Sequence, residues 1–204
     1  MEIGVSGKAR SGKDTFAEML ATELNREAYP PYVMMAFANE LKLRCQAAFD
    51  LTWEQLWGND KEIEDERYPK PDGAGFWTTR EIMQNYGAFY RSIDGQFWIK
   101  NLFKVAEEKD YTNVIVTDVR YVNEADFIAD RGGFIIRVER EDKDRIHNIE
   151  HPSETELDDY KRFDFIVMND STLDDLKVSA AKVARFLRDN EADMKKLFEI
   201  QGDK

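Results

Sequence analysis

The stretch Gly7-Lys8-Ala9-Arg10-Ser11-Gly12-Lys13-Asp14-Thr15 directly follows a short apolar run at the start of the chain. Two glycines spaced five residues apart and followed by lysine are typical of a phosphate-binding loop between a strand and a helix. The glycines let the backbone curl so that successive N–H groups point at one anion, and the lysine adds a mobile positive charge. Apolar residues then recur at helical spacing, at Phe16, Leu20 and Leu24. The stretch predicts a phosphate site, and we call Gly7–Lys13 the phosphate loop.

One position departs from the commonest form of this pattern. The hydroxyl residue that usually follows the lysine and ligates Mg²⁺ is replaced by Asp14, and Thr15 comes next. Asp14 can bind the metal or orient one of its waters, or it can simply be an acidic residue in the first turn of the helix. Thr15 can still donate to an α-phosphate. The metal ligand at the loop therefore stays open between these two residues.

Length and composition favour one α/β domain over residues 1–204. Hydrophobic residues make up 42% of the chain, which supports an ordinary buried core, and no segment approaches the ~20 apolar residues that span a bilayer. No signal peptide is expected. The single cysteine, Cys45, excludes an internal disulfide and suits a reducing cytoplasm. Two histidines and one cysteine cannot form a zinc site of the usual kind.

The formal net charge of −12 bears on the partner. A protein whose main partner is a nucleic acid is expected to carry a basic face, so this charge argues against such a partner without excluding it. A free nucleotide is smaller and can be bound by a few converging Arg and Lys residues. Monomer and homodimer both remain open.

Strand and helix patterns alternate along the chain, which favours a parallel sheet with helices on both faces. The expected strands are Glu2–Ser6, Val33–Phe37, Asn113–Thr117, Gly133–Val138 and Asp164–Met168. The expected helices are Lys13–Arg26, Asn39–Phe49, Thr79–Arg91, Gln96–Glu108, Val122–Asp130 and Leu173–Arg188. Helix-start capping boxes are expected at Thr78–Glu81 and Ser153–Glu156.

Three segments interrupt this alternation. Asn59–Gly75 is charged and contains prolines and glycines, which indicates a loop or an insert. Glu139–Glu150 is dense in charge of both signs, and it is either a solvated loop or a segment that closes over a substrate. The polar Asp189–Lys204 segment is expected to be a frayed helix.

An apolar strand ends at Asp118 and is followed closely by Arg120. Ligands collect at the carboxyl ends of the strands in a parallel sheet, so both residues should share an edge with the phosphate loop. There Asp118 can order Mg²⁺ waters or hold an acceptor group, and Arg120 can grip a phosphate with its guanidinium fork. An ordinary surface salt bridge is the alternative.

A second candidate group comes from the middle helices. Arg80 and Gln84 are four residues apart and share a helix face, and Arg91 lies further along the same helix. These residues can hold the phosphate and base of an acceptor. Trp98 belongs to the same group as a residue that can contact a base, although its spacing also fits the helix core.

Further candidates border the charged segment and the last strand. Arg137 and Arg140 flank that segment and Arg145 lies within it; an arginine on a closing loop can neutralise a transferring phosphoryl group. His151 can contact a phosphate or serve a structural purpose. Asn169 follows the last strand and can border the adenine of a donor, or belong to a plain turn.

Taken together, these stretches resemble the bacteriophage deoxynucleoside monophosphate kinase family, within the nucleoside-monophosphate-kinase-like P-loop proteins. The resemblance rests on GKARSGKDT at Gly7–Thr15, TTREIMQNYGAFYR at Thr78–Arg91, TDVRYVNEAD at Thr117–Asp126, HPSE at His151–Glu154 and FIVMNDSTLDDL at Phe165–Leu176. It implies a P-loop NTPase three-layer sandwich with a helical acceptor-binding region at about 39–110 and a lid at about 139–155.

The resemblance also implies an activity, in which the γ-phosphoryl group of ATP passes to a deoxynucleoside 5′-monophosphate with Mg²⁺. ATP would be bound by Gly7, Ala9, Arg10, Ser11, Gly12, Lys13, Asp14, Thr15 and Asn169. The acceptor would be bound by Arg80, Gln84, Arg91, Trp98, Arg120 and Glu124. Lys13, Asp118, Arg120 and Arg140 would be catalytic, and Asp14 and Asp118 would hold the metal.

Three alternatives remain on the sequence. Related P-loop kinases phosphorylate 5-hydroxymethyluracil in DNA, where the acceptor is an alcohol and Asp118 would act as a base. Dephospho-coenzyme A kinase shares the fold and also has an alcohol acceptor. A nucleotide-binding regulatory module without turnover is the third. The absence of a paired histidine and carboxylate in the motifs favours a phosphate acceptor, whose oxygen is already ionised near neutral pH.

Overall fold

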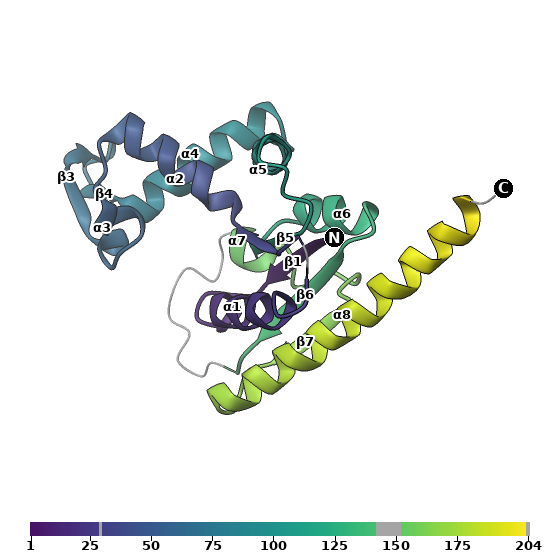
Figure 1. Ribbon diagram of the computed structural model, residues 1–204. Helices are drawn as coiled ribbons and strands as arrows, with labels where there is room; N and C mark the ends of the chain where they lie inside the picture. Colours follow the sequence, from purple (N-terminus) through teal and green to yellow (C-terminus); the bar gives the residue numbers. More distant parts are fainter. Residues whose placement is uncertain (29, 142–151, 203–204) are drawn as a thin grey trace. The chain divides into compact units, whose positions relative to one another are not determined.

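The chain folds into two compact units (Figure 1), as seen in a computed structural model that describes residues 1–28, 30–141 and 152–202. Unit 1 consists of Met1–Met35 and Ala106–Lys204, and unit 2 of Ala36–Val105. No helix in the described ranges is long and apolar enough to cross a bilayer.

Unit 1 contains a sheet of five parallel strands, in the order β2-β5-β1-β6-β7. The strands are β1 (Glu2–Ser6), β2 (Val33–Met35), β5 (Val114–Val119), β6 (Phe134–Glu139) and β7 (Phe165–Met168). β1 lies in the middle, with Gly4 opposite Val116 of β5 on one side and Ile135 of β6 on the other. The parallel α/β sheet predicted from the sequence is confirmed.

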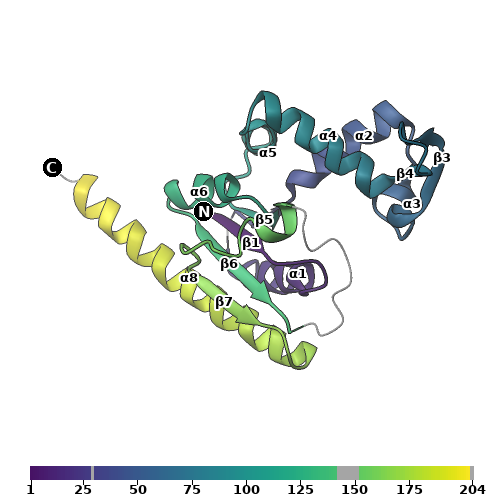
Figure 2. The same cartoon turned by 180° about the vertical axis from the view of Figure 1, so that it is seen from behind.

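Helices cover both faces of this sheet (Figures 1 and 2). Helices α1 (Lys13–Leu24) and α8 (Leu173–Gly202) pack against each other on one face, whereas α6 (Val122–Asp130) packs against β1 and β6 on the other. The short α7 (Pro152–Thr155) precedes β7. The result is a three-layer arrangement whose phosphate loop leaves the carboxyl end of the central strand.

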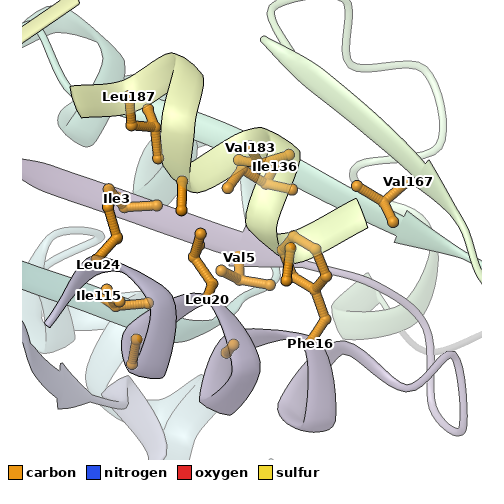
Figure 3. Packing of buried hydrophobic residues seen from close by; sticks show 14 of the residues in the cluster. Ile3, Val5, Phe16, Leu20, Leu24, Ile115, Ile136, Val167, Val183 and Leu187 are labelled. Atoms are coloured by element: carbon orange, nitrogen blue, oxygen red, sulfur yellow. The ribbon is translucent and has the colours of Figure 1, made fainter. Parts of the chain in front are cut away.

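The main core of unit 1 lies between the sheet and the helices α1 and α8. Figure 3 shows Phe16 and Leu20 of α1 beside Val5 of β1, with Val183 and Leu187 contributed by α8. Phe16, Leu20, Val5 and Leu187 are fully buried. Burial of each such side chain stabilises the fold by about 1.5–3 kcal/mol, so this core firmly anchors the strand and helix that flank the phosphate loop.

Unit 2 is mainly helical and has its own small core. Its elements are α2 (Phe37–Phe49), α3 (Trp53–Leu56), η1 (Asp60–Glu62), β3 (Glu64–Pro69), β4 (Phe76–Thr78), α4 (Thr79–Ile93) and α5 (Phe97–Glu108), the last of which ends in unit 1. Cys45, Leu51, Leu56 and Ile82 are buried together. The predicted capping box at the start of α4 is confirmed, because the Thr78 hydroxyl accepts from the Glu81 N–H while the Glu81 carboxylate accepts from the Thr78 N–H.

The sequence left Asn59–Gly75 open between a loop and an insert, and the loop alternative is wrong. This segment contains η1 and strand β3, which pairs in antiparallel fashion with β4. The charged strand is stable because the buried Asp65 carboxylate accepts hydrogen bonds from Gln55 and from the guanidinium of Arg67, at 2.7–2.9 Å. These bonds hold the pKa of Asp65 well below its usual range, the Arg67 bond being the main cause.

One further expectation needs correction. Ser153 lies within α7 rather than before it, and the Glu156 carboxylate accepts from the Val122 N–H at the start of α6, so the second capping box is absent. The polar segment after Asp189 is helical, as expected, and continues α8 as far as Gly202. It contains no glycine or proline before that residue, so nothing in the sequence ends the helix earlier.

Candidate functional site

The phosphate loop connects β1 to α1 through a backbone that needs glycine. Gly12 is the N-cap residue of α1 and has a φ of 85°, a left-handed conformation that suits glycine. A side chain at Gly7 would place its Cβ 2.7 Å from the carbonyl oxygen of Val138, so only glycine fits there. Arg10 also adopts a positive φ, of 63°. The curled loop is thus built as the sequence predicted, at the positive end of the helix dipole.

The loop's charged side chains are paired with carboxylates. Lys13 is nearly buried, and its ammonium donates to Asp14 Oδ1 at 2.6 Å. Lys8 Nζ donates to Asp158 Oδ2, also at 2.6 Å. The backbone N–H of Ala9 donates to Glu154 Oε2 at 2.9 Å. Two lysines and one backbone donor of the loop are thus bound to carboxylate oxygens, and a phosphate presents oxygen acceptors of the same kind.

Asp118 and Arg120 lie where β5 ends, beside the central strand. β5 pairs with β1, with Val119 opposite Ser6, so this strand end borders the start of the phosphate loop. Arg120 Nη1 donates to Glu154 Oε1 and, at 3.1 Å, to the carbonyl of Ser153. Burial alone would lower the pKa of Arg120, but the charges of Glu154 and Asp118 raise it above its ordinary value. The guanidinium is therefore always charged.

Glu124 has a clear structural position. One carboxylate oxygen accepts from the backbone N–H groups of Arg120 at 2.8 Å and Tyr121 at 3.1 Å, and the side chain is 3% exposed. It therefore caps the start of α6 and shapes the turn after β5. Its expected contact with a substrate remains a prediction.

Arg137 does not lie in a loop. It belongs to β6, is buried, and donates to Ser6 Oγ at 3.2 Å and to Asp158 Oδ1 at 3.0 Å. Arg140 follows β6 and is exposed. Arg145, His151 and most of the expected lid at 139–155 lie outside the described residues.

Asn169 follows β7 and contacts the phosphate loop directly. Its side-chain amide donates to the carbonyl of Ser11 at 2.9 Å, and its backbone N–H donates to the carbonyl of Glu139 at 2.7 Å. The carboxyl ends of β6 and β7 are thus joined to the loop. Ser11 Oγ is buried and has no hydrogen-bond partner in the described part of the chain.

The donor set around the loop fits Mg²⁺ in the manner usual for nucleotide enzymes. Mg²⁺ is commonly held by one or two carboxylates together with phosphates and waters rather than by a full protein cage. Asp14, whose side chain is 72% exposed, and the half-buried Asp118 can supply such carboxylates. The described ranges contain no group of three or more His, Cys, Asp or Glu side chains placed to hold a metal on their own.

The candidate acceptor residues of unit 2 lie along one face of α4. Arg80, Gln84 and Arg91 are spaced four and seven residues apart, which keeps them on one stripe of the helix. Arg80 Nε donates to Glu62 of η1. Arg80 and Arg91 are separated by about 16 Å of helix rise, too far for both to grip one phosphate.

Trp98 lies in the core of unit 2. It is 3% exposed, and its indole N–H donates to the carbonyl of Gly87 at 3.2 Å. This is the core position that its helical spacing also allowed, and the ring would have to leave it to stack on a base.

Sequence reasoning missed two residues that contact the phosphate loop. Glu154 and Asp158 supply the carboxylates that bind Ala9, Lys8 and Arg120. Their partners are far away in sequence, and no spacing rule links them. The one signal was that Glu154 lies within the HPSE stretch.

A parallel sheet with helices on both faces, whose central strand leads through a glycine loop into a helix, is a three-layer α/β fold. Among solved structures, dephospho-CoA kinase from Campylobacter jejuni has a TM-score of 0.50 and 13% identity, covering 93% of this chain and 98% of that one, which shows the fold alone.

Two sequence comparisons identify the family. A family model described as deoxynucleotide monophosphate kinase matches residues 69–180, more than half of the chain. A protein of Acanthamoeba polyphaga mimivirus, described as "Putative deoxynucleotide monophosphate kinase", is 29% identical over 190 residues, covering 85% of this chain and 90% of that protein. The chain belongs to the deoxynucleotide monophosphate kinase family. Its membership makes it a kinase that acts on nucleotides.

Proposed function

We propose that this protein transfers the γ-phosphoryl group of ATP to a deoxynucleoside 5′-monophosphate and releases the two diphosphates. The observation that carries the proposal is the combination of family membership with a phosphate loop whose central strand borders the Asp118–Arg120 strand end. The family match covers Arg80, Asp118 and Arg120, while the loop itself lies before it. The proposal therefore rests on two separate parts of the chain.

The donor triphosphate binds in the phosphate loop. Backbone N–H groups between Gly7 and Lys13 surround the phosphates, and Lys13 exchanges its Asp14 partner for a phosphate oxygen. Thr15, in the first turn of α1, is the candidate donor to the α-phosphate. Asn169, which binds the loop backbone, borders the nucleoside end of ATP. Mg²⁺, held through Asp14 or Asp118, supplies neutralisation of phosphate charge when bound.

The acceptor is a phosphate oxygen, and this sets what the protein must do. Such an oxygen is already ionised near neutral pH, so no strong general base is needed. Arg120 places a permanent positive charge beside the loop, and Arg140 is the candidate to reach the transferring group. Arg80, Gln84 and Arg91 of α4 bind the monophosphate and its base. Rate enhancement then comes from alignment and charge neutralisation.

The test is production of ADP from Mg·ATP with a panel of acceptors. The panel contains dTMP, dGMP, dCMP, dAMP, 5-hydroxymethyl-dUMP, dephospho-coenzyme A, and duplex DNA with 5-hydroxymethyluracil. We expect turnover with at least one monophosphate, loss of turnover in Lys13→Ala, and wild-type rates in the control Lys177→Ala, an exposed lysine on α8. Turnover only with the modified DNA or with dephospho-coenzyme A would replace the proposed acceptor by an alcohol.

A further inference from the structure

A single carboxylate, that of Glu154, joins the phosphate loop to Arg120. Its Oε2 accepts from the Ala9 backbone N–H at 2.9 Å, and its Oε1 accepts from Arg120 Nη1. The Glu154 side chain is 14% exposed, so water screens this interaction little. Two groups that face phosphate in the proposed reaction, the loop backbone and the guanidinium, are thus held by opposite oxygens of one side chain.

The geometry leaves part of Arg120 available to a ligand. Nη1 makes both side-chain hydrogen bonds of this residue, to Glu154 and to the Ser153 carbonyl. Within residues 1–28, 30–141 and 152–202, no hydrogen bond engages Nε or Nη2 of Arg120. An arginine binds phosphate best through two parallel N–H donors. Glu154 therefore holds one corner of the guanidinium. Nε and Nη2, which lie in the field of the Asp118 and Glu124 carboxylates and make no hydrogen bond within these residues, are the donors that we assign to an anion.

The segment that carries Glu154 is itself fastened at three points. Asp158 binds Lys8 of the loop and Arg137 of β6, and Glu156 binds the Val122 N–H at the start of α6. Because these contacts hold the segment in place, the Glu154 carboxylate keeps a defined position relative to the sheet. Glu156 sits two residues from Glu154 but touches neither the loop nor Arg120, so it provides a matched control.

We propose that Glu154 is a positioning residue for phosphoryl transfer, which holds the guanidinium of Arg120 at a set distance from the phosphate loop. The inference rests on the proposed function, because it assigns Arg120 to the phosphates. Without Glu154 the guanidinium would keep its charge but lose its place, and misplacement by about 1 Å is enough to slow a reaction by about 10²-fold.

The first experiment measures the geometry without turnover. Two-dimensional NMR follows the Ala9 amide and the Arg120 Nε–H in the wild type, in Glu154→Gln and in the control Glu156→Gln. We expect both signals to move in Glu154→Gln and to stay in place in the control. Adding Mg·ATP should shift the Arg120 signal in the wild type and in the control, and leave it nearly unchanged in Glu154→Gln. An equal Mg·ATP shift in all three proteins would overturn the proposal.

The second experiment is a kinetic double-mutant cycle with the best monophosphate of the panel. We expect Glu154→Ala to lower kcat about 10²-fold with less than a threefold change in KM for ATP. Arg120→Gln, which keeps a donor for Glu154, should be similarly slow, and the double variant should be no slower than Arg120→Gln alone. Glu156→Gln, whose amide oxygen can still accept from the Val122 N–H, should retain the wild-type kcat, and thermal unfolding should show that all variants are folded.

The outcomes separate this proposal from the proposed function. Multiplying defects in the double variant, or equal rates in Glu154→Ala and Glu156→Gln, would show that Glu154 does not act through Arg120. Tighter Mg·ATP binding in Glu154→Ala, with kcat unchanged, would show instead that the carboxylate competes with phosphate. If the wild type turns over no monophosphate, the proposed function fails, and the Mg·ATP shift of the Arg120 signal alone decides whether Glu154 positions this arginine.

Discussion

Replacing Gly12 by alanine tests how the phosphate loop is held in its curled form. Gly12 has a φ of 85°, and an alanine Cβ at this position would lie 2.3 Å from Asn169 Nδ2. Because Nδ2 is at the end of a flexible side chain, Asn169 can swing away, but it then loses its 2.9 Å hydrogen bond to the Ser11 carbonyl. The left-handed backbone costs alanine about 1–2 kcal/mol and the lost hydrogen bond about 1 kcal/mol. We expect Gly12→Ala to lower the free energy of unfolding by about 2–3 kcal/mol.

Gly132 provides the matched control. It has a similar φ of 79°, but a Cβ added there meets no atom within 4 Å. Gly132→Ala should therefore lose only the backbone contribution, about 1–2 kcal/mol. Asn169→Ala removes the hydrogen bond alone, at about 1 kcal/mol. The double variant Gly12→Ala/Asn169→Ala should then fall short of the sum of the single losses by about 1 kcal/mol, since both lose the same bond.

The assay is urea unfolding followed by two probes. All four tryptophans lie at positions 53 to 98, inside unit 2, so tryptophan fluorescence follows that unit. Far-UV circular dichroism also reports the sheet and helices of unit 1, where the loop lies. Equal losses for Gly12→Ala and Gly132→Ala, together with strict additivity in the double variant, would refute the reasoning that Asn169 holds the loop.

Three further outcomes concern unit 2. Asp65→Asn should destabilise the protein at pH 7. Because hydrogen bonds from Arg67 lower the pKa of Asp65, the stabilisation that its carboxylate supplies is present above the unfolded pKa of about 3.9 and is lost as the pH falls below that value. The difference in urea midpoint between Asp65→Asn and the wild type should therefore narrow as the pH falls below this pKa. Thr78→Ala should lower the free energy of unfolding in urea by about 1 kcal/mol, because it removes the acceptor for the Glu81 N–H. Thr78→Ser keeps a hydroxyl acceptor and should not lower this free energy. Burial raises the pKa of Cys45 to about 12, so iodoacetamide at pH 8 should label this thiol only after the protein unfolds. Labelling of the folded protein at the rate of a free thiol would contradict the burial of Cys45.

Much of unit 1 follows from local sequence pattern. The strands are buried apolar runs, the phosphate loop has a fixed glycine spacing, and helix α1 repeats its apolar residues with helical period. The predicted β1 and α6 have the observed bounds, and the ends of the other predicted elements differ by at most two residues, apart from the longer α8. Such ends depend on caps and fraying, which periodicity does not encode.

Contacts between distant residues were not predictable in the same way. β3 has the composition of a loop, and it is a strand because buried Asp65 finds Gln55 and Arg67. Likewise Arg137 reads as the edge of a charged loop, yet it is buried because Ser6 and Asp158 accept its hydrogen bonds. In both cases a charged residue takes a position that its own polarity opposes, and the partner that permits it lies elsewhere in the chain.

The pairing of charges around the loop explains how a chain with a net charge of −12 can present a site for a polyanion. A strongly basic face is unnecessary where each cation is held in place by a carboxylate, since the donors are then oriented before the ligand arrives. The arriving phosphates then meet charges that need little reorganisation. Four cations and four carboxylates form this arrangement: Lys8 with Asp158, Arg137 with Asp158 and Glu139, Lys13 with Asp14, and Arg120 with Glu154. Because Asp14 is the most exposed of these carboxylates, it is the one that can leave Lys13 most readily when phosphate binds.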